Sequence, residues 1–224
     1  MLSVTGPYTC LGAVLSALIV AGGVIGLTMH KDFYARKRRK DFFCFYTNVS
    51  NLIVLIYFAL IAPLLYKTPA LHPLIPHAEF AVMMCIALTF SVFHLLLYPA
   101  IRQAARGATR TREYWIVYTD NFIIHYLVPL GVLAYWLLCS PDKQALNVWD
   151  ALYWTAFPLA YIGLIFLRAG SKGNIEEVGS PYPYPFLDAG ALGAGFVLRT
   201  CSALYGICVA SGLILIALAR IFLS

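Results

Sequence analysis

The stretch CLGAVLSALIVAGGVIGLTM, from Cys10 to Met29, is followed directly by the basic run HKDFYARKRRK, from His30 to Lys40. An α-helix needs about 20 apolar residues to cross a hydrocarbon core of about 30 Å. No basic residue precedes the stretch, as one would in a secretory signal peptide, and the basic run follows it as a stop. The sequence therefore predicts a retained membrane helix here that ends at a charged loop.

Further apolar stretches repeat this pattern along the chain. They lie at residues 42–66, 80–101, 121–139, 149–167 and 196–223, and each is long enough to cross a membrane. Of all residues, 61% are hydrophobic and 12% are charged, whereas a soluble domain is about half apolar and about a quarter charged. The sequence predicts an all-α fold: a polytopic membrane bundle of six transmembrane helices, forming one domain over residues 1–224.

Lysine and arginine gather in alternate connections between these stretches. The first, third and fifth connections hold most of them: Lys31, Arg36, Lys37, Arg38, Arg39 and Lys40, then Arg102, Arg106, Arg110 and Arg112, then Arg168 and Lys172. The second and fourth hold Lys67 and Lys143. Because basic loops stay in the cytoplasm, we expect loops one, three and five to be cytoplasmic and both termini to face away from it. The net charge of +6 then reflects topology, and we expect no nucleic-acid partner.

The six cysteines lie mostly inside the apolar stretches, and no two of them are spaced as Cys-x-x-Cys. This spacing argues against a redox motif or a thiolate zinc site. A histidine-based metal site would have only His94 and His125 within the stretches, and would need Asp188 as its third ligand. We therefore expect no metal and no cofactor.

Polar side chains gather at one depth in three of the expected helices. Measured from the end with the basic loops, Thr47, His94 and His125 lie about one to two turns into the membrane. Each belongs to a stripe on one helical face: Thr47 with Ser50 and Asn51, His94 with Ser91 and Tyr98, and His125 with Asn121. Ionisable groups inside a membrane are candidates for function, although hydrogen bonds between helices also explain such stripes.

One detail favours a reactive site around His125. Pro129 lacks the N–H that would bond to the His125 carbonyl, which predicts a kink and a cavity beside the imidazole. A threonine hydroxyl near a neutral histidine makes a nucleophile and a general base. No carboxylate must touch His125, because Asp120 is five residues away and Asp188 depends on a loop.

The fifth connection, residues 173–195, contains GSPYPYPFLD from Gly179 to Asp188. Alternating prolines favour extended backbone over helix, and the aromatic side chains suit the membrane interface. Two interpretations stay open: a lid over one end of the bundle, or an interfacial anchor.

Three segments resemble those of a known family: FFCFYTNVSNL from Phe42, DNFIIHYLVPL from Asp120 and YPYPFLD from Tyr182. In order and spacing they are similar to the androgen-induced membrane hydrolases, especially the compact six-helix members from bacteria. The resemblance implies a multipass threonine hydrolase of lipid esters, which in animal members include branched fatty-acid esters of hydroxy fatty acids. It further implies that Thr47 is the nucleophile, that His125 is its partner and that the family's Tyr-Pro-Phe loop begins at Tyr184. Ser50 and Asn51 look like the bacterial branch, so the expected location is a bacterial cytoplasmic membrane.

The sequence thus leads us to expect an intramembrane hydrolase that takes a lipid ester sideways from the bilayer. Thr47 attacks the carbonyl and His125 takes its proton, while Asn48 or Asn51 donates to the oxyanion. The remaining expected substrate-binding or orienting residues are Ser50, His94, Asn121, Tyr184 and Asp188. Two other classes stay open: a transporter of small solutes or lipids, and a non-catalytic membrane partner protein. Nothing in the sequence indicates an oligomeric state.

Overall fold

The computed structural model describes residues 7, 9–35, 39–104, 106, 109–176 and 178–222. Over these residues the chain is mostly helical, and six helical stretches are long and apolar enough to cross a membrane. The protein is therefore an all-α, six-helix integral membrane bundle, and the fold class predicted from the sequence is confirmed.

The spans differ in how continuous they are. The first is α1 (Cys10–Ala35) and the sixth is α11 (Ala194–Phe222). The second, third and fourth each join two α-helices through a π-helical turn: α2 (Tyr46–Ile56) with α3 (Ala62–Lys67), α4 (Ile75–Val92) with α5 (Tyr98–Ala104), and α6 (Arg112–Phe122) with α7 (Val128–Cys139). The fifth is α8 (Asp150–Tyr153) followed by α9 (Ala156–Ser171). Between them lie 3₁₀ turns at Arg39–Cys44, Pro69–Leu74, Lys143–Ala145 and Pro185–Leu187, and the short helix α10 (Ala189–Leu192).

The helix ends differ from the predicted ones mainly where polar residues join a helix. The second span begins at Tyr46 instead of residue 42, because a separate 3₁₀ turn precedes it. The fourth begins at Arg112 instead of 121, and Thr111 caps it by accepting a hydrogen bond from the N–H of Tyr114 at 3.3 Å. The third begins at Ile75 instead of 80, which brings Glu79 into the span. Hydropathy marks the apolar part of a helix and misses its polar end turns. The predicted end of the sixth helix, residue 223, lies outside the described residues.

Each π-helical turn shortly precedes a proline. The turns Tyr57–Ile61, Phe93–Leu97 and Ile123–Leu127 are each followed by one residue and then by a proline, at positions 63, 99 and 129. Proline cannot donate to the carbonyl four residues earlier. The hydrogen bonds shift by one residue, so that the N–H of Val128 bonds to the carbonyl of Ile123. At Pro129, where the sequence predicts a kink, the helix has a π turn, and this turn contains His125.

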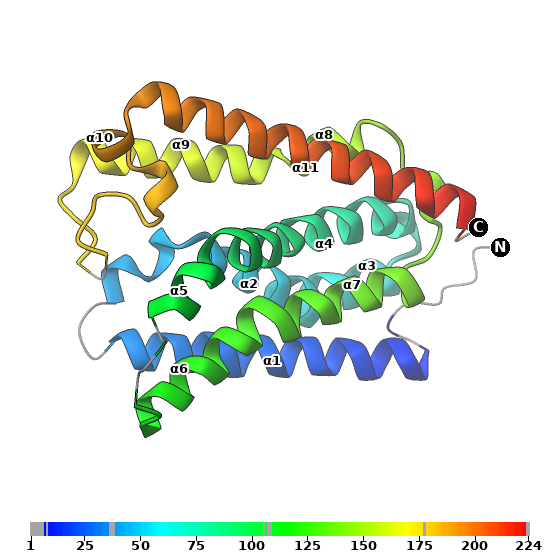
Figure 1. The fold of residues 1–224 in the computed structure, drawn as a ribbon. Coiled ribbons are helices and arrows are strands. Elements are labelled where there is room, and N and C mark those ends of the chain that lie inside the picture. The colour runs from blue at the N-terminus through cyan, green and yellow to red at the C-terminus, as the bar shows by residue number, and fades with distance from the viewer. Residues whose placement is uncertain are drawn as a thin grey trace.

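The first four spans form the main core, and the last two lie along one side of it (Figure 1). Fully buried apolar side chains from α2, α4 and α7 fill this core, among them Val54, Phe80, Met83, Ile86 and Trp136. Of the apolar window of α11, only 11% is buried in the protein, against 33% to 50% in the other spans. The sixth helix is therefore the one most exposed to lipid.

The start of α1 and the end of α11 lie at one end of the bundle, and the described parts of the first, third and fifth connections lie at the other (Figure 1). We call the latter the basic end, comprising residues 39–45, 106, 109–111, 172–176 and 178–193. Arg36, Lys37 and Arg38 lie outside the described residues. An even number of spans requires this shared position of the termini, whereas the cytoplasmic location of the basic end stays a prediction from the charge rule.

Candidate active site

Thr47 and His125 come together towards the basic end of the bundle. Thr47 lies in the first turn of α2, and His125 lies in the π turn of the fourth span. Both side chains are buried, and Oγ1 of Thr47 is 3.3 Å from Nε2 of His125. The structure thus brings the two residues expected to be catalytic into hydrogen-bond contact, although they are 78 positions apart in the chain.

The surroundings of His125 define which ring nitrogen carries the proton. Nδ1 lies 3.1 Å from the carbonyl oxygen of Asn121. Because a carbonyl oxygen only accepts, Nδ1 must be the donor. In the neutral ring, Nε2 then has a free lone pair and accepts the hydroxyl hydrogen of Thr47. Phe93 stacks on the imidazole with ring centroids 3.7 Å apart and holds its orientation. A nucleophile and an oriented general base need this arrangement.

The π turn that carries His125 is fixed on two sides. The Asn51 amide nitrogen donates to the carbonyls of Ile124 at 3.1 Å and of Thr47 at 2.8 Å, and so joins the two helices of the site. From the other side α1 approaches closely at Gly26, where a Cβ atom would lie 2.5 Å from the Ile124 side chain. Because both amide hydrogens of Asn51 are used, its expected role as oxyanion donor is corrected to that of a clamp.

The extended segment of the fifth connection covers the N-terminus of α2. Tyr184 is buried, and its hydroxyl lies against the side chain and backbone N–H of Thr47. Beside it, the Tyr161 hydroxyl donates to the carbonyl of Cys44 at 2.7 Å and accepts from the N–H of Tyr46 at 3.1 Å. Burial raises the pKa of Tyr184, so this phenol keeps its proton at neutral pH and can donate it. The segment is thus packed onto the bundle through Tyr184, and a lid function stays a prediction from the sequence.

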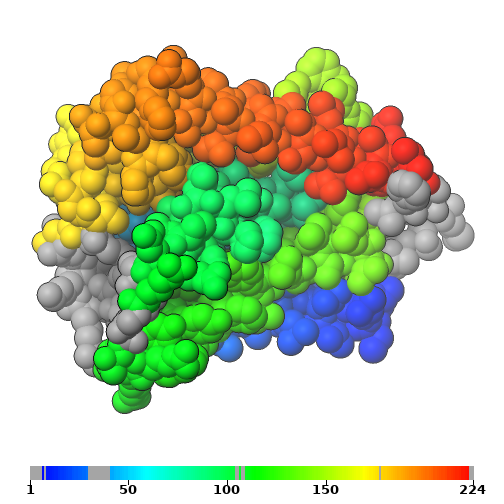
Figure 2. All heavy atoms as spheres, viewed as in Figure 1, coloured from blue at the N-terminus to red at the C-terminus, as the bar shows by residue number. Residues whose placement is uncertain are grey.

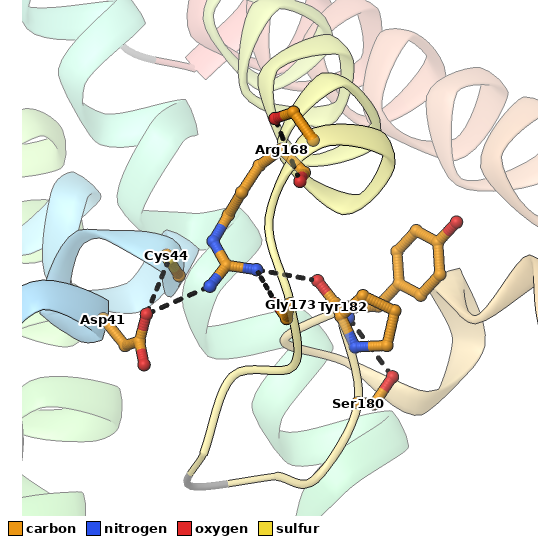
Figure 3. Close-up of polar contacts among 8 residues, drawn as sticks. Asp41, Cys44, Arg168, Gly173, Ser180 and Tyr182 are labelled. Atoms are coloured by element: carbon orange, nitrogen blue, oxygen red, sulfur yellow. Dashed lines mark hydrogen bonds and ion pairs between the residues drawn. The ribbon is translucent and has the colours of Figure 1, made fainter.

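Arg168 fastens the covering segment to the turn before α2 (Figure 3). Its guanidinium donates to the Asp41 carboxylate at 3.1 Å, and to the carbonyls of Gly173 at 3.3 Å and Pro181 at 3.2 Å. The side chains of Arg168 and Asp41 are only 15% and 9% exposed, which sets them apart from an ordinary surface ion pair. A basic residue that the sequence assigns to topology therefore also positions Tyr184.

A cavity of about 380 Å³ opens beside Thr47, between α4, α9 and α11. Thr47, Tyr161 and Tyr184 line it towards the basic end, and most of the remaining wall is apolar, including Leu88, Val92, Pro158, Ile162 and Leu204. Its volume falls in the range of small-molecule sites, about 300 to 1,000 Å³. Figure 2 shows the face of the molecule on which α11 lies beside the third span. The hydroxyl of Thr47 is therefore placed where an apolar ligand could reach it.

Ser50 and Asn48 hold α2 in place without lining the cavity. The Ser50 hydroxyl donates to the carbonyl of Thr47 at 3.1 Å and lies 2.7 Å from the Thr89 hydroxyl on α4. The Asn48 amide donates to the carbonyl of Phe42 at 2.8 Å, in the preceding turn. For these two residues the contacts are those of helix packing.

His94 does not join the site, contrary to the expectation from the sequence. It is exposed, and its Nδ1 lies 3.0 Å from the hydroxyl of Tyr126. The side chain that faces inward is that of the preceding residue, Phe93, which lines the cavity and stacks on His125. Helical spacing shows which residues share a face, but it does not show which face turns inward.

Asp188 and Asn121 also act differently from the sequence expectation. Asp188 caps α10 by accepting from the N–H of Ala191 at 2.9 Å, and it accepts from the Ser180 hydroxyl at 2.8 Å. The hydrogen bond from Ser180 lowers the pKa of Asp188, so its carboxylate is charged and committed to its own loop. The Asn121 side chain donates to the carbonyl of Val117 at 2.9 Å, and only its backbone carbonyl orients His125.

A second buried polar cluster lies towards the end that carries the termini. The Glu79 carboxylate is 3% exposed and accepts from the hydroxyls of Tyr66 at 2.9 Å and Tyr135 at 3.3 Å. Lys143 is 8% exposed and donates to the carbonyl of Ser140 at 2.6 Å. Sequence analysis missed this cluster because the predicted third helix began one residue after Glu79.

Among the described residues, no three His, Cys, Asp or Glu side chains are grouped so as to hold a metal ion. Comparison of the chain with protein-family models, with curated proteins and with solved structures gives no match. The chemistry of the Thr47 site therefore has to be inferred from its own geometry.

Proposed function

We propose that the protein is an intramembrane hydrolase of lipid esters, with Thr47 as nucleophile and His125 as base. The observation that carries this proposal is the 3.3 Å contact between Oγ1 and Nε2, with Nδ1 committed to the Asn121 carbonyl. Helix packing alone requires neither an oriented base nor an apolar cavity beside the hydroxyl. The resemblance to androgen-induced membrane hydrolases rests on segments that contain Thr47, His125 and Tyr184, and it supports the same chemistry.

In the proposed reaction the ester carbonyl lies in the cavity beside Thr47. Oγ1 forms a bond to the carbonyl carbon while its proton passes to Nε2 of His125, and the carbonyl oxygen becomes an oxyanion. The C–O bond to the alcohol then breaks, and the alcohol leaves with the proton from His125. A water molecule gives a proton to His125 and attacks the acylated Thr47. The fatty acid leaves, and Thr47 recovers its proton from His125.

We propose two donors that stabilise the oxyanion in this scheme. One is the backbone N–H of Thr47 at the start of α2, where helical N–H groups favour negative charge. The other is the hydroxyl of Tyr184, which lies against the same group. Preorganised donors of this kind are usually the largest contribution to acyl-transfer catalysis.

Tyr184→Phe is expected to lower kcat for ester hydrolysis by about a hundredfold, because removal of one oxyanion donor costs about 10² to 10³ in rate. Steady-state kinetics and thermal unfolding of the purified variant measure this. Tyr182→Phe is the matched control, since Tyr182 lies on the same segment but does not line the cavity. Its ring packs against that of Phe166, with the ring centroids 5.5 Å apart. An equal loss of kcat in both variants would mean that hydrolysis depends on the packing of the segment and not on the Tyr184 hydroxyl.

A fluorophosphonate probe tests the proposed function directly. We expect mass spectrometry of the labelled, digested protein to find one adduct on Thr47, and Thr47→Ala to remain unlabelled. Purified protein should also release fatty acid from fatty-acid esters in detergent. Uptake of a solute or lipid into vesicles, without labelling or hydrolysis, would instead support the transporter alternative.

A further inference from the structure

The cavity beside Thr47 extends along the helices. On α11 its lining runs from Leu198 to Cys208, which at about 1.5 Å per residue is a length of about 15 Å. On the fifth span it runs from Thr155, just before α9, to Ile162, in the opposite chain direction. Thr47 lies towards the basic end of this slot, and Cys208 and Thr155 lie at its far end. The slot is thus parallel to the spans, and so to lipid chains in the bilayer.

The dimensions of the slot match one lipid chain. Its length of about 15 Å is half of the hydrocarbon core of about 30 Å, which is the depth of one leaflet. One water molecule occupies about 30 Å³ in the liquid, and a methylene group is of similar size. The slot volume of about 380 Å³ therefore corresponds to about a dozen methylene groups.

The side of the slot formed by α11 is thin. The main contacts of α11 are with α10 and the Pro185–Leu187 turn near its start, and with α8 and the Lys143–Ala145 turn near its end. Between these contacts, Leu198 and Tyr205 of α11 line the slot and yet are 69% and 38% exposed, and Leu159 of α9 is 48% exposed. Along this face the slot is therefore bounded by side chains of α9 and α11 that are themselves exposed to the bilayer.

We infer that the slot holds one unbranched acyl chain, which enters sideways past α11, and that Cys208 at the far end sets the chain length accepted. The position of the ester bond at Thr47 rests on the proposed function. The binding of the chain rests only on the shape and apolar lining of the slot.

Binding of fatty acids tests this inference without any hydrolysis. Purified protein is loaded with a fluorescent fatty acid, which octanoate and dodecanoate then displace. Cys208→Trp should weaken dodecanoate binding by about tenfold, or about 1.4 kcal/mol, which is just under two buried methylene groups. Octanoate should be unaffected, because its shorter chain does not reach Cys208. Cys208→Phe should give a smaller shift in the same direction.

Ala210→Trp is the control, since Ala210 is an exposed residue of α11 that does not line the slot. It should change neither affinity. Equal weakening of both fatty acids by Cys208→Trp, or no weakening of either, would overturn the inference. Selective weakening together with absent hydrolysis would uphold the slot and contradict the proposed function. If the native protein hydrolyses esters but Cys208→Trp leaves the chain-length selectivity unaltered, the proposed function would be upheld and the slot inference contradicted.

Discussion

Thr47→Val is expected to leave a folded protein that has lost ester hydrolysis by at least about a thousandfold. Valine keeps nearly the volume of threonine but has no hydroxyl, so packing in the first turn of α2 is retained while the nucleophile is removed. Removing a member of a nucleophile–base unit takes away most of its catalysis. Initial rates on a soluble fatty-acid ester, compared at equal folded protein, measure the loss.

Thermal unfolding distinguishes this result from simple helix packing. If the contact with His125 at 3.3 Å only joined helices, Thr47→Val would lose about 0.6 kcal/mol of stability, as one hydrogen bond in a membrane does, and the folded fraction would keep its activity. Thr47→Ser, which restores a hydroxyl at the same position, should recover a large part of the rate. A folded, fully active Thr47→Val protein would end the assignment of this residue as nucleophile.

The sequence was sufficient for the membrane fold because hydropathy acts over whole helices. Six apolar stretches separated by charged loops predict six spans, and the structure has them. The depth argument also succeeded for Thr47 and His125, because rise per residue places side chains along a helix with little error. Helix ends were less accurate, since polar first turns such as that at Arg112 carry no hydropathy signal.

The sequence could not predict how each helix is rotated about its own axis, and so which of its faces turns inward. His94 and His125 each lie in a π turn ahead of a proline, and they look alike in the sequence. Only packing against α2 and α4 turns His125 inward and leaves His94 exposed. Tyr161 and Arg168 were missed for a related reason, because their partners Cys44 and Asp41 are more than a hundred residues away in the chain. No local pattern reports such contacts.

His125→Ala is expected to cost a factor similar to that of Thr47→Val, at least about a thousandfold in rate, because the hydroxyl of Thr47 then has no base to accept its proton. His94→Ala provides a control with the same change of residue in an equivalent π turn. Since His94 is exposed and its imidazole forms a hydrogen bond with Tyr126, away from Thr47, this variant should keep native activity. Fatty-acid binding in all three variants should remain, which checks that the cavity is intact.

Combining Thr47→Val with His125→Ala decides whether the two residues share one chemical step. Residues that act as a unit give strongly non-additive effects, because the first substitution already abolishes the step that the second would impair. We therefore expect the double variant to be slower than either single variant by no more than about threefold. If the two residues had independent roles, the two losses of about a thousandfold each would multiply to a loss of about a millionfold. The residual rate must be followed with a sensitive fluorogenic ester against a no-enzyme blank. Multiplied losses would mean that the 3.3 Å contact between Oγ1 and Nε2 is structural and that His125 acts elsewhere in the reaction.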